Sequence, residues 1–126
     1  MGLDMYLVSK NKETGEEING EVCYWRKANQ IRQWFVNNTG YDTGADCEYH
    51  LLTKFDLEKL VEDCKYVLKN KDSASEILPT SAGFFFGDYE YDEWYFAKLE
   101  DTIEQVEAAL ETIDFDKEDI YYYEWW

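Results

Sequence analysis

Hydrophobic and polar residues alternate with period two near both ends of this chain. Residues 3–9 (LDMYLVS) and 120–126 (IYYYEWW) are short runs rich in apolar and aromatic side chains, and such runs predict strands. Residues 49–52 predict a third, shorter strand, and the apolar triplet in residues 83–87 (GFFFG) predicts a short buried strand. The polar segment 10–20 predicts a loop or an exposed hairpin arm.

Apolar residues between these runs recur at helical spacing and predict three helices. The first spans about residues 23–38, ends near Gly40 and is followed by a loop over 40–47. Its apolar face comprises Tyr24, Ala28, Ile31 and Phe35. The second spans about 53–70, and the third spans about 91–112.

The second and third helices have the clearer signals. Thr53 and Asp56 match the capping box, in which a hydroxyl and a carboxylate bond the unpaired amides at a helix start. Residues 73–76 repeat this pattern for a single turn that Pro79 ends. The core stripe of the third helix comprises Leu99, Ile103, Val106, Leu110 and Ile113.

This order of elements predicts an α+β protein. We expect a single compact domain over residues 1–126, with a small mixed or antiparallel sheet packed by about three helices. The hydrophobic content of 45%, with 18% aromatic residues, is high enough for a folded core despite a net charge of −16. No basic N-terminal region and no long apolar run is present, so we expect a cytoplasmic protein with no membrane partner.

The negative charge is concentrated in the C-terminal third. Residues 84–126 contain fourteen Asp and Glu against two Lys, and fourteen of the twenty-three aromatic residues. Such a surface repels nucleic acid and attracts basic proteins. We therefore expect a basic host protein surface as partner and no direct contact with nucleic acid.

Five glutamates of the predicted third helix lie opposite its core stripe, and we call them the acidic row. They are Glu93, Glu100, Glu104, Glu107 and Glu111. One interpretation is an ordinary solvated helix face. The other is a partner-binding surface that imitates the charge spacing of a nucleic acid, because the row lacks lysines at the i+4 positions that usually support it.

Both arginines of the chain lie in one segment, residues 24–32 (YWRKANQIR). Trp25, Arg26, Lys27 and Arg32 could form a site for an anionic ligand, with an indole stacking and guanidinium groups binding a carboxylate or phosphate. Alternatively, Arg26 pairs internally with an acid, and Asp4, Glu21 and Asp92 are the candidates.

The residues that carry most enzyme chemistry are sparse. His50 is the only histidine, and Cys47 near it does not complete a set of four metal ligands. Cys23, Cys47 and Cys64 are predicted to be free thiols, with Cys64 buried on a helix stripe. No phosphate loop or nucleophile motif is present, so we expect no catalytic residues, no metal, no cofactor and no enzyme activity.

Aromatic residues occupy both faces of the predicted terminal strand. Tyr121, Tyr123 and Trp125 share one face, and Tyr122 and Trp126 share the other. Because both faces favour burial, a homodimer through this strand is a further hypothesis.

The chain also contains the segments MGLDMYL (1–7), EVCYWRKANQI (21–31), WF (34–35), LP (78–79), GFFFG (83–87) and YDEWY (91–95). Together they resemble a family of small proteins carried by bacteriophages and prophages, over nearly the whole chain. Family members commonly have His where this chain has Arg32, so a role for that histidine does not carry over. The resemblance implies a bacterial cytoplasmic setting and an accessory role, and it brings no established activity.

Two functional hypotheses follow. The first is a non-enzymatic phage or prophage accessory protein that binds a basic host protein, such as a defence or nucleic-acid-processing factor, through its acidic, aromatic-rich C-terminal third as a nucleic-acid mimic. The second is a binder of a small anionic ligand or signalling nucleotide around Trp25, Arg26 and Lys27.

Overall fold

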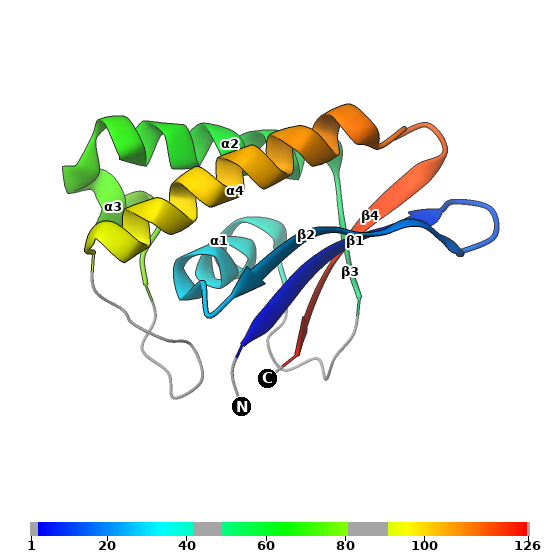
Figure 1. Ribbon diagram of the computed structural model, residues 1–126, viewed down its shortest axis with the longest axis horizontal. Coiled ribbons are helices and arrows are strands. Elements are labelled where there is room, and N and C mark those ends of the chain that lie inside the picture. Colours follow the sequence, from blue (N-terminus) through cyan, green and yellow to red (C-terminus); the bar gives the residue numbers. More distant parts are fainter. Residues whose placement is uncertain (1–2, 42–48, 81–90, 126) are drawn as a thin grey trace.

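The protein is built on an antiparallel sheet with the strand order β2-β1-β4-β3 (Figure 1). The computed structural model describes residues 3–41, 49–80 and 91–125. In these residues the strands are β1 (Asp4–Asn11), β2 (Glu17–Arg26), β3 (His50–Leu52) and β4 (Glu118–Trp125). The first and last strands of the chain are therefore neighbours in the centre of the sheet.

Helices cover one face of this sheet (Figure 1). They are α1 (Asn29–Thr39), α2 (Lys54–Lys69), η1 (Lys71–Ser73), α3 (Ala74–Ile77) and α4 (Glu93–Thr112). The two long helices, α2 and α4, lie side by side above the sheet and the shorter α1 (Figure 1). The predicted α+β class is confirmed, and the sheet is antiparallel rather than mixed.

The core lies between the helices and the inner face of the sheet. Alternate strand residues enter it, because successive side chains in a strand point to opposite faces. The strands contribute Met5, Leu7, Cys23, Trp25, Ile120 and Tyr122, all buried. The helices contribute Ile31, Trp34, Phe35, Leu57, Leu60, Cys64, Leu99 and Val106. Burial of this many large apolar side chains is the main stabilising contribution to the fold.

The predicted helix over residues 23–38 is wrong in its first six residues. Residues up to Arg26 belong to β2, and α1 begins only at Asn29. The backbone turns at Lys27, which has a positive φ of 55° and whose N–H donates to the Leu3 carbonyl. Buried Cys23 and Trp25 alternate with more exposed neighbours, as expected for a strand. The same residues also fit helical spacing, and pairing with β1 decides in favour of the strand.

The helix ends follow the predicted chemistry, with one exception. Thr53 and Asp56 form the predicted capping box at the start of α2, and Asp92 accepts from the Tyr95 N–H at the start of α4. Gly40 ends α1 in the left-handed conformation that glycine favours. Ser73 precedes α3 but makes no cap, because its hydroxyl donates backward to the Asn70 carbonyl.

A glutamine of α4 covers part of the outer edge of the sheet. The Gln105 amide oxygen accepts from the Tyr24 N–H at 2.8 Å, and its Nε2 donates to the Tyr24 carbonyl, also at 2.8 Å. These are the two backbone groups that an additional strand would bond at this position of β2. Gln105 therefore fixes α4 to the sheet and blocks strand addition there.

Several sequence predictions lie outside the described residues. They concern the buried strand in 83–87, Cys47, the tip of the loop over 40–47 and Trp126. Of the two alternatives for residues 10–20, a loop or an exposed hairpin arm, the structure shows the hairpin, since β1 and β2 pair across it.

Two buried hydroxyl groups provide a test of this core. Thr102 Oγ1 accepts from the Trp25 indole at 2.8 Å, whereas Ser9 Oγ has no hydrogen-bond partner among the described residues. We expect Thr102→Val to lower the free energy of unfolding by about 1–3 kcal/mol, because it leaves a buried indole N–H unsatisfied. Ser9→Ala should leave the free energy of unfolding unchanged or raise it by up to about 1 kcal/mol.

Urea unfolding of the two variants and the parent measures both changes. A large loss of stability in Ser9→Ala would show that its hydroxyl has a partner and would contradict this account of the inner face.

Candidate functional site

The acidic row lies along the solvent-exposed side of α4. All five of its glutamates are exposed, and Asp101 adds a sixth exposed carboxylate to the same helix. From Glu100 to Glu111 the helix rises about 16 Å and carries four charges of the row, with a mean spacing of about 5.5 Å. This spacing is wider than the roughly 3.4 Å between charges along one DNA strand. Asp101 lies on another side of the helix, where it accepts from Gln105 Nε2.

The helix dipole acts differently on the two ends of the row. Glu93 occupies the first turn of α4, where an acid stabilises the helix. Glu111 occupies the last turn, which contains no basic residue. An acid at that end lowers the stability of the helix by about 0.3–1 kcal/mol. Glu93 therefore has a local structural role, and Glu111 lowers the stability of its own helix.

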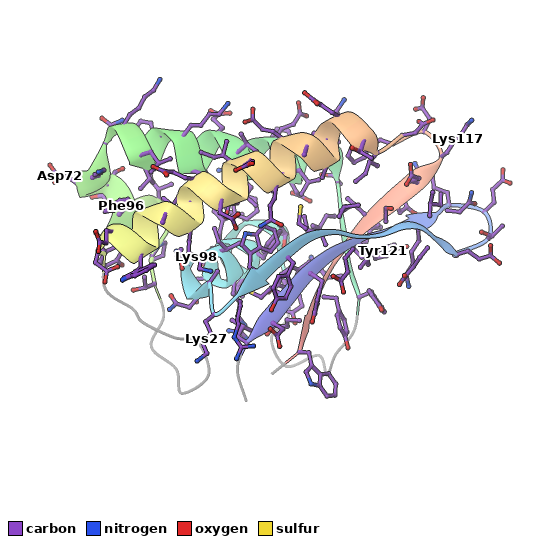
Figure 2. All side chains as sticks on the ribbon, viewed as in Figure 1. Lys27, Asp72, Phe96, Lys98, Lys117 and Tyr121 are labelled. Atoms are coloured by element: carbon purple, nitrogen blue, oxygen red, sulfur yellow. The ribbon has the colours of Figure 1, made fainter. Side chains whose placement is uncertain are left out.

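One member of the row has a basic partner. Lys65 Nζ of α2 lies 3.1 Å from Glu107 Oε2, and both side chains are about half exposed. Such a surface pair contributes about 0–1 kcal/mol. Among the described residues, no base lies within 4 Å of the carboxylates of Glu93, Glu100, Glu104 and Glu111. Lys98 lies in the N-terminal half of α4 and Lys117 beyond its C-terminal end (Figure 2).

The neighbouring helix α2 has a mixed surface. Its exposed residues include Lys54, Lys65 and Lys69 together with Glu58 and Glu62. Of the described helices, α4 therefore has the most acidic surface, with Lys98 as its one base.

Of the predicted anionic-ligand site, two residues are exposed on the surface. Arg26 Nη1 lies 3.4 Å from Asp4 Oδ1, which is one of the internal pairs expected from the sequence. Tyr24 also donates to this carboxylate oxygen, at 2.7 Å. Lys27 is exposed at the turn between β2 and α1.

The other two residues of that site are buried and have internal partners. Trp25 donates to Thr102 of α4 and packs edge-on against Phe35. Arg32 Nε lies 2.7 Å from one carboxylate oxygen of Glu124 and 3.1 Å from the other. The structure thus separates Trp25 and Arg32 from the exposed pair, and the four residues do not form one surface.

The buried ion pair joins α1 to the central strand β4. Its side chains are 8% exposed for Arg32 and 2% for Glu124, and the Tyr122 hydroxyl also donates to Glu124 at 3.3 Å. Burial and the Glu124 charge raise the pKa of Tyr122 well above its usual value, so this hydroxyl remains a donor. Arg32, Glu124 and Tyr122 therefore form one buried polar network, which the sequence did not predict.

The described thiols are unsuited to nucleophilic chemistry. Burial raises the pKa of both Cys23 and Cys64 to about 12, with smaller contributions from Asp101 and Asp63 respectively. The thiolate, which is the reactive form, is therefore scarce at neutral pH. Within the described ranges no three His, Cys, Asp or Glu side chains come together as metal ligands.

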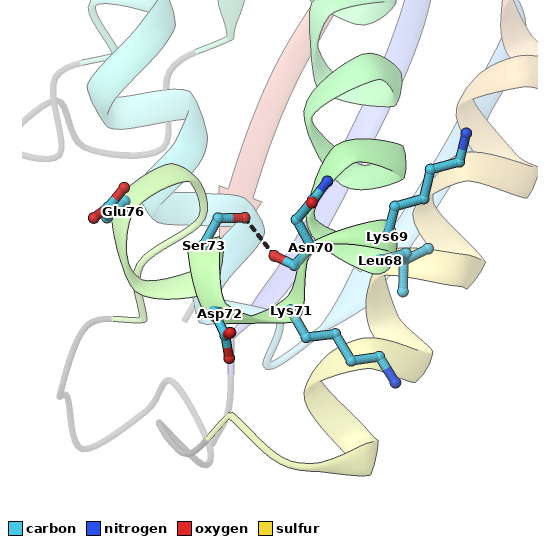
Figure 3. A pocket seen from close by; sticks show the side chains of 7 residues that line it. All are labelled: Leu68, Lys69, Asn70, Lys71, Asp72, Ser73 and Glu76. Atoms are coloured by element: carbon cyan, nitrogen blue, oxygen red, sulfur yellow. Dashed lines mark hydrogen bonds between the residues drawn. The ribbon is translucent and has the colours of Figure 1, made fainter.

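An open hollow of about 710 Å³ lies where α2 meets η1 (Figure 3). Lys69 and Lys71 line it together with Asp72 and Glu76, and the two lysines extend away from Glu76 (Figure 3). Because the charges are of both signs and do not converge, this hollow has no feature of a substrate pocket.

A surface that sequence reasoning found only in part lies on the side of the sheet away from the helices. Residues Tyr121, Tyr123 and Trp125 of β4 point to this side, as predicted from their alternation. Tyr6, Tyr24 and Tyr49 join them from three other segments. The strand register that brings these tyrosines together has no signal in a single sequence, so it could not be predicted. Because β4 is paired on both sides at residues 120–122, a dimer through that part of the strand would use its side chains.

A scan of protein-family models, a search of curated proteins and a search of solved structures each found no match to this chain. No helix in the described residues has the length and apolar character needed to cross a membrane.

The buried ion pair generates a stability prediction. Either Arg32→Met or Glu124→Leu leaves one buried charge without its partner, and we expect each to lower the free energy of unfolding by about 3–5 kcal/mol. The double variant should recover most of this loss, because no uncompensated charge remains. A double-mutant cycle in urea measures the coupling, and simple additivity of the two losses would contradict the assignment.

Proposed function

We propose that this chain is a non-enzymatic binding protein that engages a basic partner protein through the acidic row of α4. The observation that supports this most directly is the run of exposed carboxylates on one side of α4, four over about 16 Å. A basic groove built to hold a nucleic-acid strand has complementary charge.

The position of these charges also favours a binding role over simple solvation. Glu104, Glu107 and Glu111 repel one another at i, i+3 and i+4 spacing, and Glu111 opposes the helix dipole. Lysines at positions 104 and 111, on either side of Glu107, would keep the face soluble and would replace this repulsion by attraction. Natural sequences break local stability rules chiefly at functional positions.

The partner we propose is a bacterial host factor in the cytoplasm, such as a defence nuclease or another nucleic-acid-processing protein. The resemblance of the chain to small phage and prophage proteins supports this setting. Binding of the acidic row would occupy the groove of such a protein without any chemical step. The anionic-ligand alternative has less support, because Trp25 and Arg32 are engaged in the core.

Charge reversal on α4 separates binding from stability. We expect the triple variant Glu100→Lys, Glu104→Lys, Glu111→Lys to fold with equal or higher thermal stability. The changes at 104 and 111 turn repulsion with Glu107 into attraction, and the change at 111 favours the dipole, which offsets the like charges at 100 and 104. The same variant should lose the partner, with at least a hundredfold weaker affinity. Pull-down from nuclease-treated bacterial lysate identifies the retained protein, and calorimetry with that purified protein gives the affinity.

The matched control carries the same change of net charge elsewhere. Glu13, Glu16 and Glu76 are exposed, lie outside α4 in the sequence, and can be replaced by Lys together. This control should retain most of the affinity, and duplex DNA should compete with the parent for the partner. Equal loss of binding in both triple variants would show that only the overall charge matters and would sink the proposed role of α4.

A further inference from the structure

The side of the sheet opposite the helices carries a cluster of five tyrosines, which we call the tyrosine face. Its members are Tyr6, Tyr24, Tyr49, Tyr121 and Tyr123. Register places Tyr6 between Tyr24 of β2 and Tyr123 of β4. In the described part of the chain no helix packs on this side, and Tyr24, Tyr49 and the adjacent Trp125 are 41–57% exposed.

The rings form a continuous series across the sheet. Tyr24 and Tyr6 have centroids 5.3 Å apart, and Tyr6 and Tyr123 are 6.0 Å apart. Tyr123 stacks on Tyr49 at 4.7 Å with an interplanar angle of 21°. These are favourable aromatic separations, so the rings hold one another in place and offer a rigid surface.

At one end of the tyrosine face, the ammonium group of Lys10 already lies over a ring. Lys10 Nζ lies 3.8 Å from the centroid of the Tyr49 ring and 5.4 Å from that of Tyr121. A cation over a tyrosine ring is attracted by the negative charge of the ring face. This internal contact shows which charge the exposed rings accept.

Rings and acids beside this cation line a hollow with no base among its lining residues. The nearby bases have partners: Lys10 lies over Tyr49, and Arg26 pairs with Asp4. An open hollow of about 340 Å³ is lined by Tyr6, Val8, Glu17, Glu21, Tyr49, Tyr123 and Trp125. Burial and the nearby carboxylates Asp4 and Glu21 raise the pKa of Tyr6, so its phenol stays neutral at physiological pH. Two carboxylates beside neutral aromatic rings complement a planar cation.

We propose that the tyrosine face is a docking surface for an arginine-bearing segment of a partner protein. The guanidinium planes would stack on Tyr6, Tyr49 and Tyr123, while Glu17 and Glu21 accept their N–H groups. Arginine fits better than lysine, because its planar, weakly hydrated guanidinium stacks on rings and forms paired bonds to carboxylates. This surface lies across the sheet from α4, so the inference does not depend on the acidic row.

Two other occupants fit the charges less well. Exposed aromatic residues on a sheet also stack nucleic-acid bases, but those platforms pair their rings with a positive groove. Glu17 and Glu21 would repel the phosphates. A second copy of this chain would bring a net charge of −16 against the same value.

Titration of the full chain with three defined peptides tests the proposal. The probes are an acetylated peptide of four Arg-Gly repeats, its lysine analogue, and its citrulline analogue, which keeps the planar group without the charge. Nuclear magnetic resonance in about 0.3 M NaCl, where exposed charges beyond about 6 Å are screened, gives both affinity and location. We expect affinity in the order arginine, lysine, citrulline, with shifts confined to residues of the tyrosine face.

Point variants then assign the contacts. Tyr49→Leu, Tyr123→Leu and the double variant Glu17→Gln, Glu21→Gln should each weaken the arginine peptide about fivefold or more. Lys10→Gln should strengthen it severalfold, since it removes a competing cation from Tyr49. Tyr66→Leu, an exposed tyrosine of α2, is the matched control and should have no effect.

Three results would overturn the proposal. They are equal binding of the citrulline peptide, binding of a thymidine oligonucleotide in place of the arginine peptide, and shifts confined to α4. The last result would support the acidic row instead, so the two surfaces are judged separately. The α4 triple-lysine variant should still bind the arginine peptide at this salt concentration.

Discussion

Burial on only one face of the sheet is the constraint on which the rest of this structure depends. The inner face carries Leu7, Trp25 and Tyr122, all essentially inaccessible to water, and three helices are needed to cover it. The outer face of the same strands must then carry residues that tolerate water, with an apolar body and a polar tip. Tyrosine meets this requirement, and the alternation of the strands places it there repeatedly.

Burial of the inner face of the sheet also restricts where charged residues can lie. A chain with a net charge of −16 must place its acids where water or a partner can solvate them. Two of the described acids are exceptions: Glu118 is buried and accepts from the Asp114 N–H, and Glu124 lies in the core, where Arg32 and Tyr122 compensate it. That network joins the first helix to the last strand, so it connects segments about ninety residues apart in sequence. Breaking it therefore affects the whole core and not one helix.

Most elements could be predicted from local patterns, and the main error has a physical cause. The capping box at Thr53 and the long periodic stripe of α4 are local signals, and both are confirmed. Residues 23–28 carry helical and strand periods at once, and only pairing with β1 resolves the ambiguity. Pairing is a tertiary event, so no local rule could decide it.

For the candidate surfaces too, features set by local sequence could be predicted, and features set by tertiary packing could not. Exposure of the acidic row followed from its position opposite the core stripe, and the pairing of Arg26 with Asp4 followed from the surplus of acids. The ion pair of Glu107 with Lys65 depends on how α2 packs against α4, and a sequence alone does not give it. The tyrosine face depends on register between strands more than a hundred residues apart, which explains why only its β4 part was foreseen.

The two surfaces have a common physical property that connects structure to function. On α4, Glu111 opposes the helix dipole and the glutamates repel one another. On the sheet, the rings of Tyr24, Tyr49 and Trp125 are exposed to water. Neither arrangement improves the stability of the isolated chain, because each leaves favourable contacts unmade. Both become favourable against a surface that brings positive charge, through ion pairs in one case and ring stacking in the other. The proposed binding protein, with opposite faces suited to cations, would account for both arrangements.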